Sequence, residues 1–538
     1  MDTVPRVASV REASYELLRA HGLTTVFGNP GSTELPFLAG FPDDFRYVLG
    51  LQEAVVVGMA DGYAQATGKP ALVNLHTAPG VGNAMGAIFN ACENRTPLVI
   101  TAGQQVRPMI TMEALLTNPD PTFLPRPWVK GSYEPARAQD VPAALARAYQ
   151  LARLPPAGPV FVSVPMDDWA AEADEVAARQ VTGRVTTGRA GPDPQALEDL
   201  AGRLAGASDP VLVVGPDVDA SGGWDAAVAL AERCRLPVWA PPASGSGRIG
   251  FPEDHPCFRG ILPPAIGPLA QTLEGSDLVV VVGAPVFTYY PYIPGPVLPE
   301  GTSLMLVTND PDEAARAPAG DAIVADVALA LEALLAQVPA ANRPLPAPRP
   351  APQPAPASDP ISAQAAMAAL REVLPADGVV VNESPSNMLA LRSQLRLSRP
   401  GSYFTAAGGG LGYGLPAAVG VQLGRPERPV VGVIGDGSVH YAVPALWSAV
   451  AHEVPVTVLV VRNDEYAILK WFAEFEGEMG APGLEVAGLD NVAIARGYGM
   501  AARRVDGVDE LRTALSEGIA SDVPELVEVT VAPGMSLE

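Results

Sequence analysis

Cysteine is scarce in this chain of 538 residues. Only Cys92, Cys234 and Cys257 occur, and no two of them have the spacing of a C-x-x-C pair. This pattern indicates neither a disulfide framework nor a zinc site. We expect three thiols that are buried or take no part in function.

Positive charge is also in short supply. The sequence has 35 lysines and arginines against 59 aspartates and glutamates, which gives a formal net charge of −24 at pH 7. A chain so acidic is repelled by nucleic acid and by anionic membranes, so we expect neither as a partner. A small anionic cofactor can still bind, because such a site depends on local groups.

Long apolar runs are absent. No run reaches the length needed to cross a membrane, and residues 1–6 lack the charged-then-apolar pattern of a secretory signal. We therefore expect a cytoplasmic protein.

Apolar, strand-like segments alternate with amphipathic, helix-like segments through most of the chain. This alternation predicts an α/β protein of three doubly wound parallel-sheet domains, with helices on both faces of each sheet. Composition places these domains at residues 1–180, 181–338 and 361–538. Residues 339–360 are dense in proline and alanine and should form an extended linker.

A short glycine motif near the C-terminus has the character of a diphosphate site. The motif Gly435-Asp436-Gly437-Ser438 follows the apolar run 430–434. Glycines let backbone N–H groups approach a diphosphate closely, and a helix that starts at Ser438 would direct further N–H groups at the anion.

A metal site is predicted beside this motif. Asn463 follows the next apolar run, 458–461. The Asp436 carboxylate, the Asn463 amide oxygen and the Glu465 backbone carbonyl would suit magnesium, with calcium as an alternative, beside phosphate oxygens and water. The plainer interpretation is a pair of strand-to-helix turns in which Asp436 is an ordinary helix N-cap.

Glu53 lies on an otherwise apolar helical segment, residues 51–64. A carboxylate in such surroundings must find a hydrogen-bond partner or take up a proton. Alternatively, Glu53 points outward at the start of the helix, as lone glutamates usually do.

Several further segments carry a family resemblance. In chain order they are Val26-Phe27-Gly28-Asn29-Pro30-Gly31-Ser32, the Glu53 segment, Asn74-Leu75-His76, Gly103-Gln104-Gln105, Gly215-Pro216-Asp217-Val218-Asp219, Gly283-Ala284-Pro285-Val286-Phe287, Gly409-Gly410-Leu411-Gly412 and the metal motif. With these segments the chain resembles the thiamine diphosphate-dependent 2-keto acid decarboxylases, and within that family most of all the benzoylformate decarboxylases.

This resemblance implies a reaction, and it implies that different domains bind different parts of the cofactor. It implies non-oxidative decarboxylation of an aromatic or branched 2-keto acid through a thiamine ylid and an enamine. The first domain would bind the aminopyrimidine of the cofactor and the third its diphosphate and metal. In this family the two domains at each active site come from different subunits, so a homodimer would be the smallest competent unit and a tetramer the commoner assembly.

The resemblance also assigns the cofactor residues. Glu53 would hydrogen-bond a ring nitrogen of the aminopyrimidine and favour the tautomer that removes the thiazolium proton. Leu411 would hold the two rings of the cofactor in a bent shape, although it could equally be a core leucine after a glycine turn. The remaining cofactor residues would be Asn29, Gly409, Gly410, Gly435, Gly437 and Ser438.

Ser32 and His76 are the polar groups expected around the substrate. By itself Ser32 would be read as a cap of the following helix, whereas the resemblance places it at the substrate carboxylate and carbonyl. His76 ends the apolar run 71–75, where open α/β sheets present catalytic groups. A structural histidine is the alternative there, but the resemblance makes His76 a proton donor or relay.

The chain departs from the benzoylformate decarboxylases at one position. Those enzymes carry a second active-site histidine where this sequence has Tyr290. A free phenol has a pKa near 10 and an imidazole one of about 6.5, so tyrosine is the poorer proton shuttle at neutral pH. Slower protonation after loss of CO2 would favour carboligation with a second aldehyde.

The segment after the metal motif resembles the helix that borders the acyl group of the substrate. Leu469 and Phe472 share one helical face by their i,i+3 spacing. Ile468 would be bulkier than the matching residue of the benzoylformate decarboxylases and would narrow access to the substrate pocket. The alternative is a purely structural role, because apolar residues on a helix usually pack in the core. An apolar wall fits an aromatic or branched acyl group and distinguishes poorly between them.

Two rival functions stay open. One is a carboligating synthase, such as an acetolactate synthase or another enzyme that forms 2-hydroxy ketones. The other is a catalytically silent homologous subunit. The joint retention of Glu53, Asp436 and Asn463 speaks against a silent subunit, because a protein without catalysis has no physical need for all three.

Overall fold

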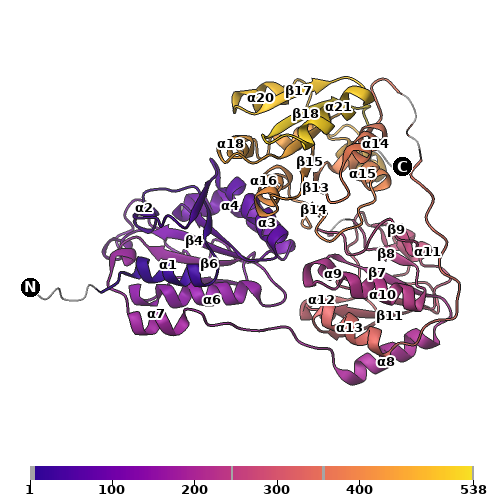
Figure 1. Ribbon diagram of the computed structural model, residues 1–538, viewed down its shortest axis with the longest axis horizontal. Coiled ribbons are helices and arrows are strands. Elements are labelled where there is room, and N and C mark those ends of the chain that lie inside the picture. Colours follow the sequence, from indigo (N-terminus) through magenta and orange to yellow (C-terminus); the bar gives the residue numbers. More distant parts are fainter. Residues whose placement is uncertain (1–6, 244–245, 354, 356–357, 536–538) are drawn as a thin grey trace, which may run out of the picture.

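Three six-stranded sheets, each entirely parallel, form the framework of the protein (Figure 1). The computed structural model describes residues 7–243, 246–353, 355 and 358–535. Residues 1–6, on which the prediction about a signal sequence was based, lie outside this part. The three sheets follow one another along the chain and confirm the predicted fold class. They lie within the three predicted domains, whose end residues stay a prediction.

The first sheet has the strand order β2-β1-β3-β4-β6-β5. Neighbouring residues of β1 enter different cores, since Val26 packs with α1, α6 and α7 while Phe27 packs with α3 and α4. Both faces of the sheet are therefore covered by helices. The strands are β1 Thr25–Gly28, β2 Arg46–Leu49, β3 Ala71–Leu75, β4 Leu98–Gln104, β5 Gly131–Tyr133 and β6 Val160–Pro165. The helices are α1 Val10–Ala20, α2 Leu35–Leu38, α3 Glu53–Thr67, α4 Thr77–Glu93, α5 Arg107–Ile110, α6 Val141–Arg153 and α7 Glu175–Val181, with 3-10 turns at Ala138–Asp140 and Asp168–Ala170.

The second sheet has the order β12-β11-β10-β7-β8-β9. Its central strand β10 is buried along its whole length, which explains its uninterrupted Leu-Val-Val-Val-Val sequence. The strands are β7 Pro210–Val214, β8 Val238–Ala240, β9 Phe258–Ile261, β10 Leu278–Val282, β11 Ser303–Thr308 and β12 Asp321–Val324. The helices are α8 Pro194–Gly206, α9 Pro216–Ser221, α10 Trp224–Cys234, α11 Ile266–Thr272, α12 Pro311–Arg316 and α13 Val327–Gln337.

The third sheet has the order β14-β13-β15-β16-β18-β17, with β13, β15 and β16 side by side. The strands are β13 Val379–Glu383, β14 Tyr403–Thr405, β15 Val430–Gly435, β16 Thr457–Arg462, β17 Ala501–Val505 and β18 Glu525–Thr530. The helices are α14 Ala363–Val373, α15 Met388–Gln394, α16 Gly414–Gly424, α17 Asp436–Val439, α18 Pro444–Ala451, α19 Ala467–Glu476, α20 Asn491–Gly497 and α21 Val508–Ile519, with a 3-10 turn at Pro385–Asn387.

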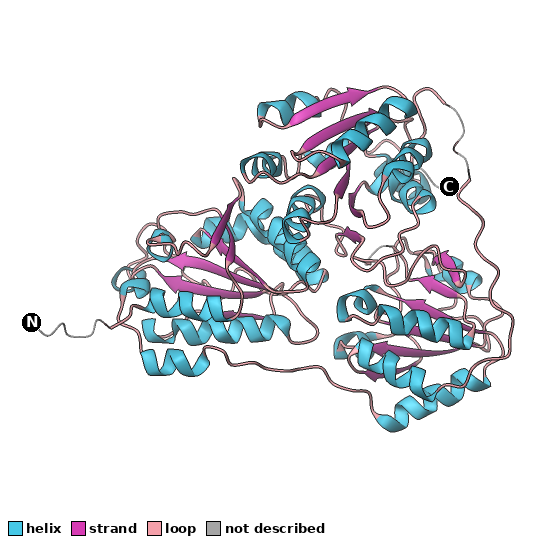
Figure 2. Cartoon of the chain, in the orientation of Figure 1, coloured by secondary structure: helices cyan, strands magenta, loops and turns pink. Residues whose placement is uncertain are grey.

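A long loop joins the second domain to the third (Figure 2). The described residues between α13 and α14 contain no helix or strand, in keeping with their proline-rich sequence. None of the helices in the described part of the chain is both long and apolar enough to span a bilayer.

The first and third domains meet along helices α3 and α16, which share one apolar core. Glycines permit this close contact. A Cβ atom at Gly420 would lie 1.9 Å from the Met59 carbonyl oxygen, and one at Gly62 would lie 2.2 Å from the Ala417 carbonyl oxygen. Any side chain at these two positions would push the helices apart.

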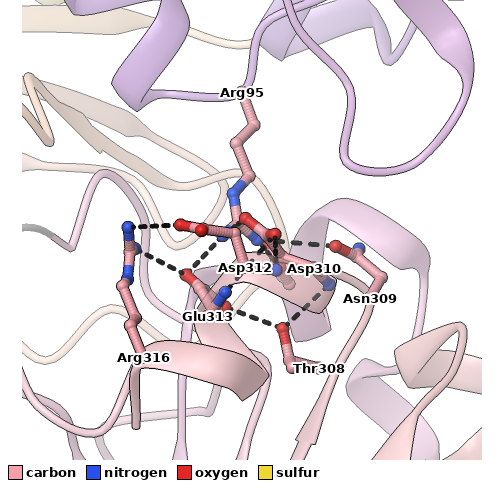
Figure 3. Close-up of polar contacts among 8 residues, drawn as sticks. Arg95, Thr308, Asn309, Asp310, Asp312, Glu313 and Arg316 are labelled. Atoms are coloured by element: carbon pink, nitrogen blue, oxygen red, sulfur yellow. Dashed lines mark hydrogen bonds and ion pairs between the residues drawn. The ribbon is translucent and has the colours of Figure 1, made fainter.

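Arg95 joins the first domain to the second (Figure 3). It follows α4, and its guanidinium donates to Asp217, to Glu313 and, at 3.1 Å, to Asp310. Burial raises the pKa of the Asp217 and Glu313 carboxyl groups, while Arg95 acts against this shift. One cation thus compensates three acidic groups of the second domain.

We expect Arg95→Ala to lower the free energy of unfolding by about 3–5 kcal/mol, because it leaves buried carboxylates without their cation. Arg137→Ala is the matched control, since the Arg137 side chain is 67% exposed and its partner Asp140 also lies at the surface. This control should leave the free energy of unfolding almost unchanged. Urea unfolding of the purified proteins measures both, and equal losses would contradict the importance of the buried cluster.

Candidate active site

Glu53 is the first residue of α3, and its side chain is buried, with 7% exposure. Its two carboxylate oxygens accept hydrogen bonds from the Asn29 side-chain amide at 3.2 Å and the Asn83 side-chain amide at 3.1 Å. The alternative in which Glu53 points outward is therefore wrong. Both partners are neutral donors, so the carboxylate is held in place by amides alone.

His76 stands directly before α4, at the end of β3. Its Nδ1 atom lies 2.9 Å from a carboxylate oxygen of Glu34 and 3.2 Å from the Thr33 hydroxyl. An imidazole that donates from Nδ1 to a carboxylate keeps Nε2 free for a second partner. Glu34 therefore fixes the orientation of the His76 ring and leaves Nε2 available.

Glu34 is a functional candidate that the sequence alone did not single out. Its buried carboxylate also accepts the backbone N–H groups of Gly31 at 2.9 Å and Gly103 at 2.8 Å. The sequence signal was its place in the run Gly31-Ser32-Thr33-Glu34, and its partner at residue 103 could not be read from that run. The loop before α2 and the end of β4 are thereby tied to His76.

Ser32 lies beside this group and is exposed. The interpretation of Ser32 as a helix cap is wrong, because the N-cap of α2 is Glu34 and no side chain caps that helix. Gly31 must be small, since a Cβ atom there would lie 1.9 Å from His76 Nδ1. The turn thus brings the Ser32 backbone close to the imidazole.

Asp436 is buried at the end of β15 and starts the one-turn helix α17. This corrects two predictions: the helix begins two residues before Ser438, and the N-cap is Gly435. The Asp436 carboxylate accepts the backbone N–H groups of Asn463 at 3.2 Å and Asp464 at 2.8 Å. The carboxylate therefore binds the end of one strand to the end of its neighbour.

Asn463 and Glu465 complete the predicted metal ligands. The buried Asn463 Nδ2 atom has no hydrogen-bond partner among the described residues. Both side-chain oxygens of Glu465 are engaged, one by Lys470 and the other by the Gly534 N–H at 2.6 Å. The Glu465 carboxylate is thus already occupied by protein donors, and the backbone carbonyl of Glu465 stays the predicted ligand.

The donor set fits a hard divalent cation. Asp436, Asn463 and Glu465 follow β15 and β16, which pair in parallel, and they offer a carboxylate, an amide and a carbonyl oxygen. No group of three or more His, Cys, Asp or Glu side chains that could hold a metal occurs in the described ranges. Carboxylate, amide and carbonyl oxygens are the ligands that magnesium and calcium take in proteins.

Gly409, Gly410 and Leu411 lie in the loop between β14 and α16. The Asn90 side chain donates to the Gly410 carbonyl at 2.9 Å and accepts from the Gly410 N–H at 3.2 Å. The Glu383 carboxylate, at the end of β13, accepts from the Gly412 N–H at 2.7 Å. Asn90 and Glu383 were not predicted.

Two of the predicted pocket residues come from different domains and meet. The ring centroids of Tyr290, in the second domain, and Phe472, on α19, are 4.9 Å apart. Ile468 at the start of α19 donates its N–H to the Ser386 hydroxyl at 3.1 Å. Leu469 is exposed. Tyr290 and Phe472 are therefore in contact, while an apolar wall that they share with Ile468 and Leu469 stays a prediction.

The predicted site residues thus fall into two groups. Asn29, Ser32, Glu53 and His76 belong to the first domain, while the glycine motifs, the metal ligands and the apolar wall belong to the second and third domains. In the part of the chain that the structure describes, no hydrogen bond or ring contact joins a predicted residue of one group to one of the other.

The stability of the protein should depend on pH through Glu383. Burial raises the pKa of the Glu383 carboxyl from its ordinary 4.5 to about 7, although the N–H groups that it accepts oppose the shift. An acid with a raised folded-state pKa stabilises the fold fully below pH 4.5 and loses that contribution as the pH rises through about 7.

We therefore expect the wild type to lose stability relative to Glu383→Gln as the pH rises. The difference between their free energies of unfolding should fall by about 3 kcal/mol between pH 4.5 and pH 8. Urea titrations of both proteins without cofactor measure this difference. A difference that stays constant or rises with pH would contradict the raised pKa.

Comparisons with known proteins agree with this geometry. Three family models of thiamine pyrophosphate enzymes match the chain: the N-terminal TPP binding domain at residues 8–121, the central domain at 197–334 and the C-terminal TPP binding domain at 386–529. The chain is 53% identical over 526 residues to benzoylformate decarboxylase of Pseudomonas aeruginosa, covering 97% of this chain and 98% of that protein.

Solved structures give the same result over nearly the whole chain. The thiamine diphosphate-dependent 4-hydroxybenzoylformate decarboxylase of Rhodococcus jostii RHA1 has a TM-score of 0.96 and 48% identity, covering 98% of this chain and 100% of that one. Benzoylformate decarboxylase from Polynucleobacter necessarius has a TM-score of 0.95 and 43% identity, covering 98% and 99%. With three matching domain models, a full-length relative and this shared fold, the chain belongs to the thiamine pyrophosphate enzyme family.

Proposed function

We propose that this protein decarboxylates an aromatic 2-keto acid of the benzoylformate type, without oxidation, to the aldehyde and CO2. The observation that carries the proposal is the buried Glu53 carboxylate, held by two neutral amides and facing no cationic partner among the described residues. The relatives named benzoylformate or 4-hydroxybenzoylformate decarboxylase support the substrate class.

The cofactor of this reaction is thiamine diphosphate, bound with magnesium or calcium. When bound, it supplies the electron sink that accepts the electron pair of the broken carbon–carbon bond. Asp436, Asn463 and the Glu465 carbonyl would hold the metal. Gly435, Gly437 and Ser438 would direct N–H groups at the diphosphate, because they lie at the turn from β15 into α17.

The proton-handling groups come from the first domain. Glu53 would hold a proton shared with a ring nitrogen of the aminopyrimidine. His76 would donate or accept a proton at Nε2, because its Nδ1 faces Glu34. Ser32 would bind the substrate carboxylate and carbonyl, and its exposed hydroxyl is available for this role.

The complete site requires, in this proposal, two copies of the chain. Each copy contributes the first-domain group of one site and the glycine, metal and apolar residues of another. Large apolar side chains exposed near both groups support the assembly, and these are Leu35, Tyr290, Tyr441 and Leu469. A homodimer is the minimum, and a tetramer would bury more of this surface.

Product analysis with thiamine diphosphate and magnesium tests the proposal. Benzoylformate, pyruvate and branched 2-keto acids should be compared, and benzoylformate should give CO2 and benzaldehyde. Acetolactate from pyruvate as the main product would favour a carboligating synthase, and the absence of turnover with every substrate would favour a silent subunit.

In the same assay Glu53→Gln should lower the turnover number by about 10²–10⁴-fold, the usual span of general acid–base effects, while cofactor stays bound. Glu16→Gln, on the exposed face of α1, is the matched control and should keep full activity. Unchanged activity of Glu53→Gln would contradict the assignment.

Carboligation is the second reaction that we propose. The reason is Tyr290, which stands where the benzoylformate decarboxylases carry a histidine. Its ring packs on Phe472, and a tyrosine there delivers a proton less readily than a histidine would. The wild type should form a 2-hydroxy ketone when aldehyde accumulates. Tyr290→His should lower the ratio of ketone to aldehyde by about tenfold or more, whereas Tyr290→Phe, which retains the ring, should not. Absence of ketone from the wild type would refute the proposal.

A further inference from the structure

The loop between β14 and α16, residues 406–413, carries Leu411, and we call it the Leu411 loop. It crosses from the third sheet to the helix that packs on the first domain. The inference below rests on the proposed function, in which Leu411 supports the bent cofactor. It concerns the groups of this chain that decide where Leu411 lies.

Glu383 anchors the loop on the side of α16. Its carboxylate oxygens accept the Gly412 N–H at 2.7 Å and the Gly414 N–H. These N–H groups lie at the N-terminal end of α16, where unpaired donors and the helix dipole attract an anion. Gly414 must be small, since a Cβ atom there would lie 2.5 Å from Glu383 Cβ.

Glu383 has no ion-pair partner in the described residues, although only 6% of it is exposed. Burying a carboxylate without a cation costs free energy, even where backbone N–H groups return part of it. A buried amide or apolar side chain would avoid that cost. The carboxylate is therefore better explained by the geometry that it imposes than by stability.

Asn90 anchors the loop on the other side. Its amide pairs with both backbone groups of Gly410, and directly after the end of α4 the Asn94 side chain accepts the Ala407 N–H at 2.8 Å. The contact is close, because a Cβ atom at Gly410 would lie 2.6 Å from Asn90 Oδ1. The loop is thus held against the first domain.

Leu411 is the single residue between these two anchors. Gly410 on one side is fixed by Asn90, and Gly412 on the other side is fixed by Glu383. The backbone of Gly412 has φ +93°, which only glycine adopts readily, so the turn itself is also determined. The direction of the Leu411 side chain follows from the two hydrogen-bonded neighbours.

We propose that Glu383 is a positioning residue for catalysis: together with Asn90 it fixes the backbone on both sides of Leu411 and thereby sets the support for the bent cofactor. Among the described residues, no hydrogen bond or ion pair joins the Glu383 side chain to the metal ligands or to the diphosphate motif. Loss of its carboxylate should therefore disturb turnover more than cofactor retention.

The first test uses the full-length protein without cofactor. In Glu383→Gln, amide hydrogen exchange of residues 406–414 should accelerate by about tenfold or more, because glutamine keeps one acceptor oxygen and its NH2 group cannot accept the second N–H. Gln422→Ala is the matched control: Gln422 is buried at the far end of α16 and accepts the Val430 N–H at 3.0 Å. It should leave exchange in the Leu411 loop unchanged. Unchanged exchange in Glu383→Gln would overturn the anchoring role.

The second test is a double-mutant cycle with Leu411→Ala. Glu383→Gln should lower the turnover number by about tenfold to a hundredfold, as misplacement by about 1 Å does, with the KM for thiamine diphosphate changed less than threefold. In the Leu411→Ala background the same substitution should cost less than twofold, since the residue it positions is gone. Multiplicative losses would overturn the proposal.

Asn90→Ala is the second variant if Glu383→Gln does not fold. It should accelerate exchange at Gly410 and show the same lack of additivity with Leu411→Ala. If Leu411→Ala itself retains full turnover, the proposed role of Leu411 fails, and the exchange experiment still decides whether Glu383 holds the loop.

Discussion

The close packing of α3 on α16 is the constraint on which the rest of the structure depends. Glycines at positions 62 and 420 let the backbones of the two helices touch, so the first and third domains share one core. Glu53 begins one of these helices, and the Leu411 loop leads into the other. The spacing between the helices therefore fixes both the carboxylate and the loop.

Much of this could be predicted from sequence because it depends on local rules. Apolar periodicity gave the three sheets, and the rule that parallel strands present groups at their carboxyl ends placed Asp436 beside Asn463. The start of the helix was misplaced by two residues, since α17 begins at Asp436, and the Asp436 carboxylate accepts N–H groups of the two residues that follow β16.

The unpredicted residues share a different property. Glu34, Asn83, Asn90 and Glu383 each bind a partner that is distant in sequence, and each looks ordinary in its own segment. Glu34, for example, is read as a turn residue until Gly103 is brought against it by the strand order of the first sheet. Such roles arise only once tertiary contacts decide which loops meet.

Helix α4 connects several of these groups, and its regular pitch has a consequence for sequence change. His76 precedes it, Asn83 and Asn90 lie seven residues apart on one face, and Arg95 follows its end. Deleting or inserting one residue within the helix would turn everything beyond that point by about 100°. We therefore expect α4 to have the same length in homologues, even where its amino acids differ.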